Sequence, residues 1–215
     1  TIKLYFLLCI CTSFSVGGVF PKRILILGDS HYCGECDDCG IKGISENQGT
    51  GCCNFTRDVV AKFIEYRQGK RPHEGWMNTY LKFEKALVGH ETDATESLKI
   101  WNSVAFYNYI QTAYIGESRQ AYSSSDYAQS FPYFKQLLNE LKPDMIIVWG
   151  YRLWNNLPGE NWIDGGTVSA SGIGEEYGYY ALENGKKVLT LRSTHPSAGF
   201  AWDAYGEVFK KAFAL

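Results

Sequence analysis

The stretch Gly28-Asp29-Ser30-His31-Tyr32 places an acid, a hydroxyl, an imidazole and a phenol in a row, directly after the apolar run at 23–27. A carboxylate or an imidazole can activate water, and a serine hydroxyl can attack when a histidine accepts its proton. A second imidazole follows a later apolar run, in Thr194-His195-Pro196-Ser197. Together the two segments indicate hydrolytic chemistry, with either water or Ser30 as the attacking group.

Other polar side chains also follow predicted strands. Asn108 follows the apolar stretch at 103–107, Arg152 lies just beyond 145–149, and Ser193 follows the last apolar run. Parallel strands present their carboxyl ends at one edge of a sheet, so we expect these residues to converge with the first motif. Convergence from four separate segments predicts a site more strongly than any single motif does.

The elements that would position these residues alternate between strands and helices. Continuous apolar, β-branched runs and an Asn-Gly hairpin turn predict strands at 23–27, 103–107, 145–149, 179–182 and 188–191. Helices are predicted near 56–64, at 74–88, after 92, at 131–141 with Pro132 in the first turn, and from about 199. The alternation predicts an α/β fold, a three-layer α/β/α arrangement around a mostly parallel, roughly four-stranded central sheet.

The bulk composition predicts one globular domain. The chain has 215 residues, of which 45% are hydrophobic and 20% are charged, which suits a substantial core. We assign 21–215 to a single domain with a cysteine-rich loop at 33–53, and we expect a monomer. The formal net charge of -2 argues against a protein that coats nucleic acid through overall basicity, but it allows a local basic face.

Residues 1–20 form an apolar segment with two interpretations. Lys3 precedes a short apolar run that ends in small residues, which is the pattern of a secretory signal. The alternative is a helix or strand packed on the core. The run is too short to cross a membrane, so no membrane association is expected. The rest of the chain is typical of an intracellular enzyme, which predicts a cytoplasmic location with export as the alternative.

The Gly-Asp-Ser triplet resembles the first block of the SGNH (GDSL-type) acyl hydrolases. By that resemblance Ser30 would be the nucleophile, His195 its base and Asn108 a donor to the oxyanion. That family places an Asp three residues before the catalytic His, where it orients the ring. Arg192 stands there in this chain, and a cation would depress the basicity of the imidazole. We therefore keep an acyl hydrolase with Ser30 as nucleophile as the alternative hypothesis for the function.

Four segments in order resemble the uracil-DNA glycosylase superfamily. They are the first motif, an aromatic residue before a helix, a strand that ends in Asn, and a His-Pro-Ser segment after the last strand: Gly28-Asp29-Ser30-His31-Tyr32, Asn54-Phe55-Thr56, Val104-Ala105-Phe106-Tyr107-Asn108 and Thr194-His195-Pro196-Ser197. The resemblance spans most of the chain from 23 to about 203. It implies an enzyme that flips a base out of DNA and hydrolyses its N-glycosidic bond.

The resemblance implies a role for each residue around the base. His195 would donate to the carbonyl oxygen of the leaving base, and Asn108 would read the base edge through two hydrogen bonds. Phe55 would stack on the base. Tyr32 would lie where a tyrosine excludes the thymine methyl group.

The remaining implied contacts are to the DNA itself. Ser193 and Ser197 would hold phosphates through hydroxyl and backbone N–H groups. Phe200 lies just beyond the His-Pro-Ser segment, where the family inserts an apolar wedge into the emptied stack. DNA is therefore the expected partner, and the chemistry itself needs no cofactor.

The first motif departs from the family at the residues that activate water. The best-known members have Asp where this chain has Ser30, and Pro where it has His31. Asp29, His31 or a main-chain carbonyl would then orient the water. The expected base is uracil or a modified pyrimidine such as a substituted cytosine of phage DNA, which implies DNA repair or antiviral defence. A non-catalytic DNA-binding member of the fold is the remaining alternative.

Five cysteines lie between 33 and 53, as Cys33-x2-Cys36-x2-Cys39 followed by Cys52-Cys53. Cys-x-x-Cys spacing turns two thiolates onto one metal ion, and a distant cysteine completes the tetrahedron. We expect a structural zinc ion held by Cys33, Cys36, Cys39 and Cys52, with Cys53 as the alternative fourth ligand. Some members of the superfamily carry a 4Fe–4S cluster, which is the competing assignment.

Overall fold

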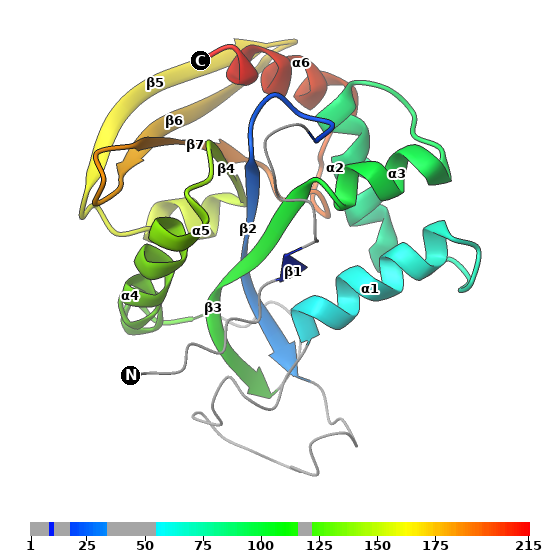
Figure 1. Cartoon of the computed structure of the whole chain (residues 1–215), viewed down its shortest axis with the longest axis horizontal. Helices are drawn as coiled ribbons and strands as arrows, with labels where there is room; N and C mark the ends of the chain where they lie inside the picture. The colour runs from blue at the N-terminus through cyan, green and yellow to red at the C-terminus, as the bar shows by residue number, and fades with distance from the viewer. Residues whose placement is uncertain (1–8, 11–17, 34–54, 116–121) are drawn as a thin grey trace.

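The computed structural model describes residues 9–10, 18–33, 55–115 and 122–215. In these residues one sheet has seven strands in the order β1-β3-β2-β4-β7-β6-β5 (Figure 1). The strands are β1 (Cys9–Ile10), β2 (Ile24–Cys33), β3 (Val104–Ile115), β4 (Met145–Trp149), β5 (Trp162–Ala170), β6 (Ile173–Ala181) and β7 (Lys187–Ser193). The helices are α1 (Phe55–Arg67), the 3-10 turn η2 (Gly75–Met77), α2 (Asn78–Val88), α3 (Ala94–Trp101), α4 (Ser124–Leu141), α5 (Tyr151–Asn156) and α6 (Trp202–Phe213).

The middle of the sheet is parallel and its margins are antiparallel. β3, β2, β4 and β7 run parallel to one another, whereas β6 and β5 continue the sheet as an antiparallel hairpin beyond β7. The predicted α/β class is therefore confirmed, but the prediction of roughly four strands was wrong. β5 was not predicted from the sequence, because most of its residues are exposed and it contains Gly165 and Gly166 in place of an apolar run.

Successive side chains of the central strands point to opposite faces of the sheet, and they pack into two hydrophobic cores, one on each face. Ile24 and Ile26 of β2 belong to the core covered by α1, α2, α3 and α6. Leu25 and Leu27 belong to the other core, which α4 and α5 cover. The sheet thus lies between two groups of helices (Figure 1).

The helices differ from the sequence expectations mainly in their bounds. α4 begins at Ser124, well before the predicted start, because Ser123 caps it through a capping box with Asp126. Pro132 consequently lies inside the helix and not in its first turn, which corrects the prediction. The short helix α5 after β4 was not predicted at all, and its six residues carry too little periodicity to reveal it.

The N-terminal segment is described only in part. Cys9–Ile10 pairs antiparallel with β3, with Cys9 opposite Phe106, so this piece extends the sheet edge. Phe20 belongs to the core on the side of α1. Among the helices of the described ranges, none combines the length and apolar character that a membrane crossing requires.

An ion-pair cluster joins three parallel strands at the edge opposite their carboxyl ends. Asp144, just before β4, accepts hydrogen bonds from the backbone N–H of Arg23 at 2.9 Å and from its guanidinium at 3.1 and 3.2 Å. The ammonium group of Lys186, just before β7, also pairs with Asp144. Burial alone would raise the pKa of the Asp144 carboxyl, but these donors outweigh it and hold the pKa well below its usual value.

Candidate functional site

The carboxyl ends of β2, β3, β4 and β7 border a cleft of about 1310 Å³. Five of the predicted site residues line it, and they come from β2, β3 and the loop after β7: Asp29, Ser30, Asn108, His195 and Ser197. Residues far apart in the sequence therefore meet in one cleft, as the sequence predicted, but Asp29, Ser30 and Asn108 lie within β2 and β3 and not beyond the ends of these strands.

Asn108 is held in a fixed orientation on one wall of the cleft. Its side-chain Nδ2 donates to Thr56 Oγ1 at 2.9 Å, and only 7% of the residue is exposed. Its carboxamide lies directly over Gly28, its partner in the β2–β3 register. A Cβ added to Gly28 would come within 2.2 Å of Asn108 Oδ1, so only glycine allows this approach.

Asp29 is half-buried, and both of its carboxylate oxygens accept hydrogen bonds. The hydroxyl of Tyr127 donates to Oδ1 at 2.9 Å, and Arg152 Nε donates to Oδ2 at 2.5 Å. Burial lowers the pKa of the Arg152 guanidinium, but the charge of Asp29 and its hydrogen bond, with smaller contributions from Tyr127 and Tyr122, together raise the pKa overall. Arg152 comes from α5, so the helix that the sequence did not predict supplies the counter-ion of the first motif.

Ser30 lies beside Asp29 and contacts a tyrosine from another segment. A hydrogen bond joins its side chain to Tyr122, which lies under the guanidinium of Arg152 with 5.7 Å from Cζ to the ring centroid. Burial raises the pKa of the Tyr122 hydroxyl, although the hydrogen bond with Ser30 opposes the shift. Ser30 therefore belongs to a polar group built around Asp29.

His195 is oriented by its own loop. Nδ1 accepts a hydrogen bond from the backbone N–H of Ser197 at 3.2 Å and lies 2.8 Å from the Ser197 hydroxyl. A backbone N–H can only donate, so neutral His195 carries its proton on Nε2, which is then a donor. The ring also stands edge-on to Trp149, at a centroid distance of 5.5 Å.

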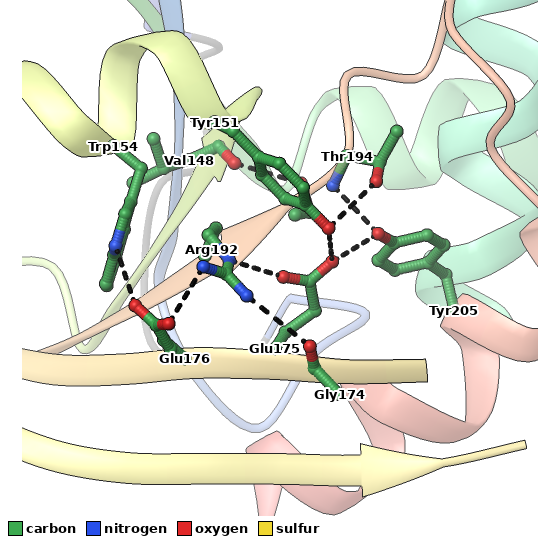
Figure 2. A network of polar contacts seen from close by, with 10 residues as sticks. Val148, Tyr151, Trp154, Gly174, Glu175, Glu176, Arg192, Thr194 and Tyr205 are labelled. Carbon is green, nitrogen blue, oxygen red and sulfur yellow. Dashed lines mark hydrogen bonds and ion pairs between the residues drawn. The ribbon is translucent and has the colours of Figure 1, made fainter. Parts of the chain in front are cut away.

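A buried carboxylate anchors the residue before His195 (Figure 2). The backbone N–H of Thr194 donates to the hydroxyl of Tyr205 at 2.8 Å, and that hydroxyl in turn donates to Glu175 Oε1. Glu175 is fully buried, and the hydroxyl of Tyr151 also donates to it, at 3.0 Å. Burial and the bond to Glu175 both raise the pKa of the Tyr205 hydroxyl, so it stays protonated as a donor.

Arg192 compensates this buried charge. Its Nε donates to Glu175 Oε2 at 2.7 Å, and its Nη1 lies 3.0 Å from Glu176 (Figure 2). Its guanidinium also covers the ring of Tyr151, with 4.5 Å between Cζ and the centroid. The residue that occupies the place of an orienting Asp in the acyl hydrolases is thus engaged in an ion pair on β6.

Cations and aromatic rings that the sequence did not single out also line the cleft. Lys62 and Lys82 project into it and make no ion pair with another described residue. Five aromatic residues also line it: Trp76, Tyr80, Phe106, Trp149 and Tyr151. The helices α1 and α2 carry several of these residues, and only their position beside the strand ends reveals them, because charge and aromatic spacing on a helix are ordinary surface and core features.

Two residues predicted to contact DNA do not line the cleft. Ser193 is fully buried, and its hydroxyl donates to the carbonyl of Val148 at 2.9 Å, which ties β7 to β4. Phe200 is only 4% exposed and stacks on Tyr205 at 4.1 Å with an interplanar angle of 8°. As placed, Ser193 is a strand contact and Phe200 is a core residue, because neither side chain reaches the surface.

The other predicted site residues lie partly or wholly outside the described residues. His31 and Tyr32 belong to β2 and Phe55 begins α1, but only their backbone is described. The same holds for Cys33. The ligands expected from the loop, Cys36, Cys39 and Cys52, fall outside the described ranges. Among the residues that the structure does describe, no group of three or more His, Cys, Asp or Glu side chains is placed to hold a metal ion.

Comparison with models of known protein families and with curated protein sequences found no match to the chain.

Proposed function

We propose that the chain is a monofunctional DNA glycosylase that hydrolyses the N-glycosidic bond of a flipped pyrimidine. The observation that carries the proposal is that Asn108 and His195 line the same cleft. A hydrogen bond with Thr56 orients Asn108, and a hydrogen bond with the Ser197 backbone orients His195. One supplies an amide for recognising a base edge, and the other supplies an Nε2–H donor for its carbonyl oxygen.

The proposed reaction breaks one bond and forms another. The bond between C1′ of the deoxyribose and the base nitrogen breaks, and its electron pair leaves with the base. Water adds its oxygen to C1′ and loses a proton to solvent, and the base anion takes up a proton from solvent, which leaves an abasic site and the free neutral base. Positive charge develops on the sugar and negative charge on the base, so His195 Nε2–H would stabilise the departing anion.

Asp29 suits the sugar side of this reaction. From the described residues Oδ1 accepts one hydrogen bond, donated by Tyr127, and a carboxylate oxygen has room for a second donor, which would let Oδ1 also hold a water molecule. Its negative charge would stabilise the oxocarbenium-like sugar. The pairing with Arg152 keeps the carboxylate in place. His31 and a main-chain carbonyl stay as the alternative water ligands.

The charge of the cleft suits a nucleic acid strand. Lys62 and Lys82 face the cleft without an ion-pair partner in the described part of the chain, so they are available to phosphates. A chain with a net charge of -2 would then bind DNA through this local basic surface and not through its overall charge. We propose DNA as the partner on this basis, with Phe55 or a cleft aromatic ring stacking on the base.

The direct test is a panel of oligonucleotides that contain uracil or modified cytosines, incubated with the full chain and then with alkali. Strand breaks at one modified base, lost in His195→Ala by about 100-fold or more, would support the proposal. The absence of breaks on every substrate, with protein loaded with zinc or iron in turn, would overturn it.

The two alternative functions predict different outcomes in the same assays. An acyl hydrolase requires ester turnover that Ser30→Ala abolishes, but His195 Nδ1 faces Ser197 and not an orienting carboxylate. A non-catalytic binding protein requires base-specific DNA binding without product, lost in Asn108→Ala. Nothing in the cleft favours either over excision.

A further inference from the structure

A second hollow of about 430 Å³ lies between α5 and the β5–β6 hairpin. We call it the aromatic groove, because four aromatic rings line it: Trp154, Trp162, Tyr177 and Tyr180. Its volume falls within the range of sites for small organic molecules. None of its lining residues lines the cleft described above, so its function is independent of the proposed base excision.

The rings of the groove are held in place by one another and by the hairpin. Trp162 stands edge-on to Trp154 at 5.4 Å and to Tyr180 at 5.1 Å between centroids. A Cβ added to Gly178 would come within 2.2 Å of Trp162 Cζ2, so the absence of a side chain at Gly178 admits the indole. Tyr180 is itself buried and supports the others, so the groove presents preformed aromatic surface from Trp154, Trp162 and Tyr177.

Among the described residues, two carboxylates are the only acidic or basic side chains that line the groove, apart from the tyrosine hydroxyls. The Trp154 indole N–H donates to Glu176 at 3.2 Å, and the Trp162 indole N–H donates to Asp164 at 2.9 Å. Glu176 is also paired with Arg192, but Asp164 makes no ion pair with another described residue. No Lys or Arg of the described ranges lines the groove, so it attracts cations and repels phosphates.

We propose that the aromatic groove binds an organic cation with a methylated ammonium group. Aromatic faces attract such a cation through their quadrupole, and the carboxylates add Coulomb attraction. A methylated ammonium is weakly hydrated and loses little on leaving water. A small inorganic cation would need a shell of oxygen ligands, which two carboxylates tied to indole groups do not supply.

The test follows the six tryptophan indole N–H signals of the full chain by NMR during titration with choline chloride. The matched neutral probe is 3,3-dimethylbutan-1-ol, in which carbon replaces the ammonium nitrogen, and sodium chloride controls for ionic strength. We expect choline to shift the Trp154 and Trp162 signals saturably, with the alcohol binding at least about tenfold more weakly. A peptide with trimethyl-lysine, titrated in parallel, distinguishes a protein tail from a free small molecule.

Two variants test whether the charge and the aromatic rings of the groove cause the binding, and a third variant is the control. Asp164→Asn keeps an acceptor for the Trp162 indole but removes the charge, and should weaken choline binding about twofold to fivefold. Trp154→Leu removes an aromatic face and should weaken it further. Glu140→Gln, on an exposed face of α4, should change nothing. Equal binding of choline and the alcohol, undiminished binding in Asp164→Asn, or no saturable shift would each refute the proposal.

Discussion

At the scale of single residues, the contact between Gly28 and Asn108 is the tightest constraint on the site. Gly28→Ala would place a methyl group 2.2 Å from Asn108 Oδ1, so the carboxamide must leave its position and its bond to Thr56. We expect kcat/KM for base excision to fall by about 100-fold, because displacements of about 1 Å at a reacting group have effects of this size.

The matched control for this substitution is Gly159→Ala. Its added Cβ would meet no atom within 4 Å, and its backbone is not in the left-handed region. Kinetics and thermal melts of both variants separate the outcomes. Unchanged kcat/KM in folded Gly28→Ala would show that the orientation of Asn108 does not matter to the reaction.

The tautomer of His195 is a second prediction at this scale. Because the Ser197 N–H donates to Nδ1, we expect the neutral ring to be protonated on Nε2. Nitrogen-15 chemical shifts of the imidazole, assigned with His195→Gln, distinguish the two tautomers directly. A ring protonated on Nδ1 would remove the proposed donor to the leaving base.

At the scale of elements, the sequence predicted the strands that carry the site better than the contacts between their residues. The apolar runs before Asp29, Asn108 and His195 revealed three strands, because buried parallel strands read as continuous hydrophobic segments. Two of the predicted ends were wrong, because β2 continues through Asp29 to Cys33 and β3 continues through Asn108 to Ile115. The partners of these residues were not predictable in the same way. Arg152 reaches Asp29 from a helix of six residues, and Glu175 lies on a strand without an apolar run.

Two predicted site residues lie outside the cleft for a related reason. Phe200 and Ser193 follow the expected motifs in sequence, but the chain turns their side chains inward, one onto Tyr205 and the other onto β4. Whether a residue beside a motif points to solvent or to the core depends on helices that pack from elsewhere. Spacing within the motif contains no information about those helices.

The connection between β6, β7 and α6 yields a prediction at the same scale. Tyr205→Phe removes the hydroxyl that links the Thr194 N–H to Glu175, so the Thr194 N–H loses its acceptor and Glu175 loses one of its donors, while Tyr151 and Arg192 still bond to Glu175. We expect a loss of about 1–3 kcal/mol in the free energy of unfolding and a lower kcat with little change in KM. Denaturant unfolding and steady-state kinetics measure these two effects.

Tyr180→Phe is the control for this prediction. It also removes a largely buried hydroxyl, which donates to the carbonyl of Pro158 at 3.0 Å, but it lies away from the His195 loop. We expect it to lower stability without lowering kcat. Equal kcat losses in both variants would mean that the network has no specific effect on His195.

At the scale of the whole molecule, the stability of the sheet depends on pH through Asp144. Hydrogen bonds from Arg23 and Lys186 outweigh burial and depress the pKa of this carboxyl in the folded state. A depressed pKa contributes stability that is fully present above the unfolded value of about 3.9, and that is lost as the pH falls below it. The stability that this cluster contributes should therefore be lost in acid and not in base.

Asp144→Asn isolates this contribution. At pH 7 the variant should unfold with a free energy lower by about 1.5–3 kcal/mol, the value of hydrogen bonds to a charged group. The difference from the wild-type protein should shrink as the pH falls from about 4 toward 2, because the Asp144 carboxyl of the unfolded wild-type chain binds a proton there that the folded protein, with its depressed pKa, does not bind. Glu207→Gln, on the exposed face of α6, should differ from the wild type by a small amount at every pH. Urea unfolding at a series of pH values measures both differences, and a constant deficit for Asp144→Asn across that range would contradict the assignment, since the cluster would then act through packing and not through charge.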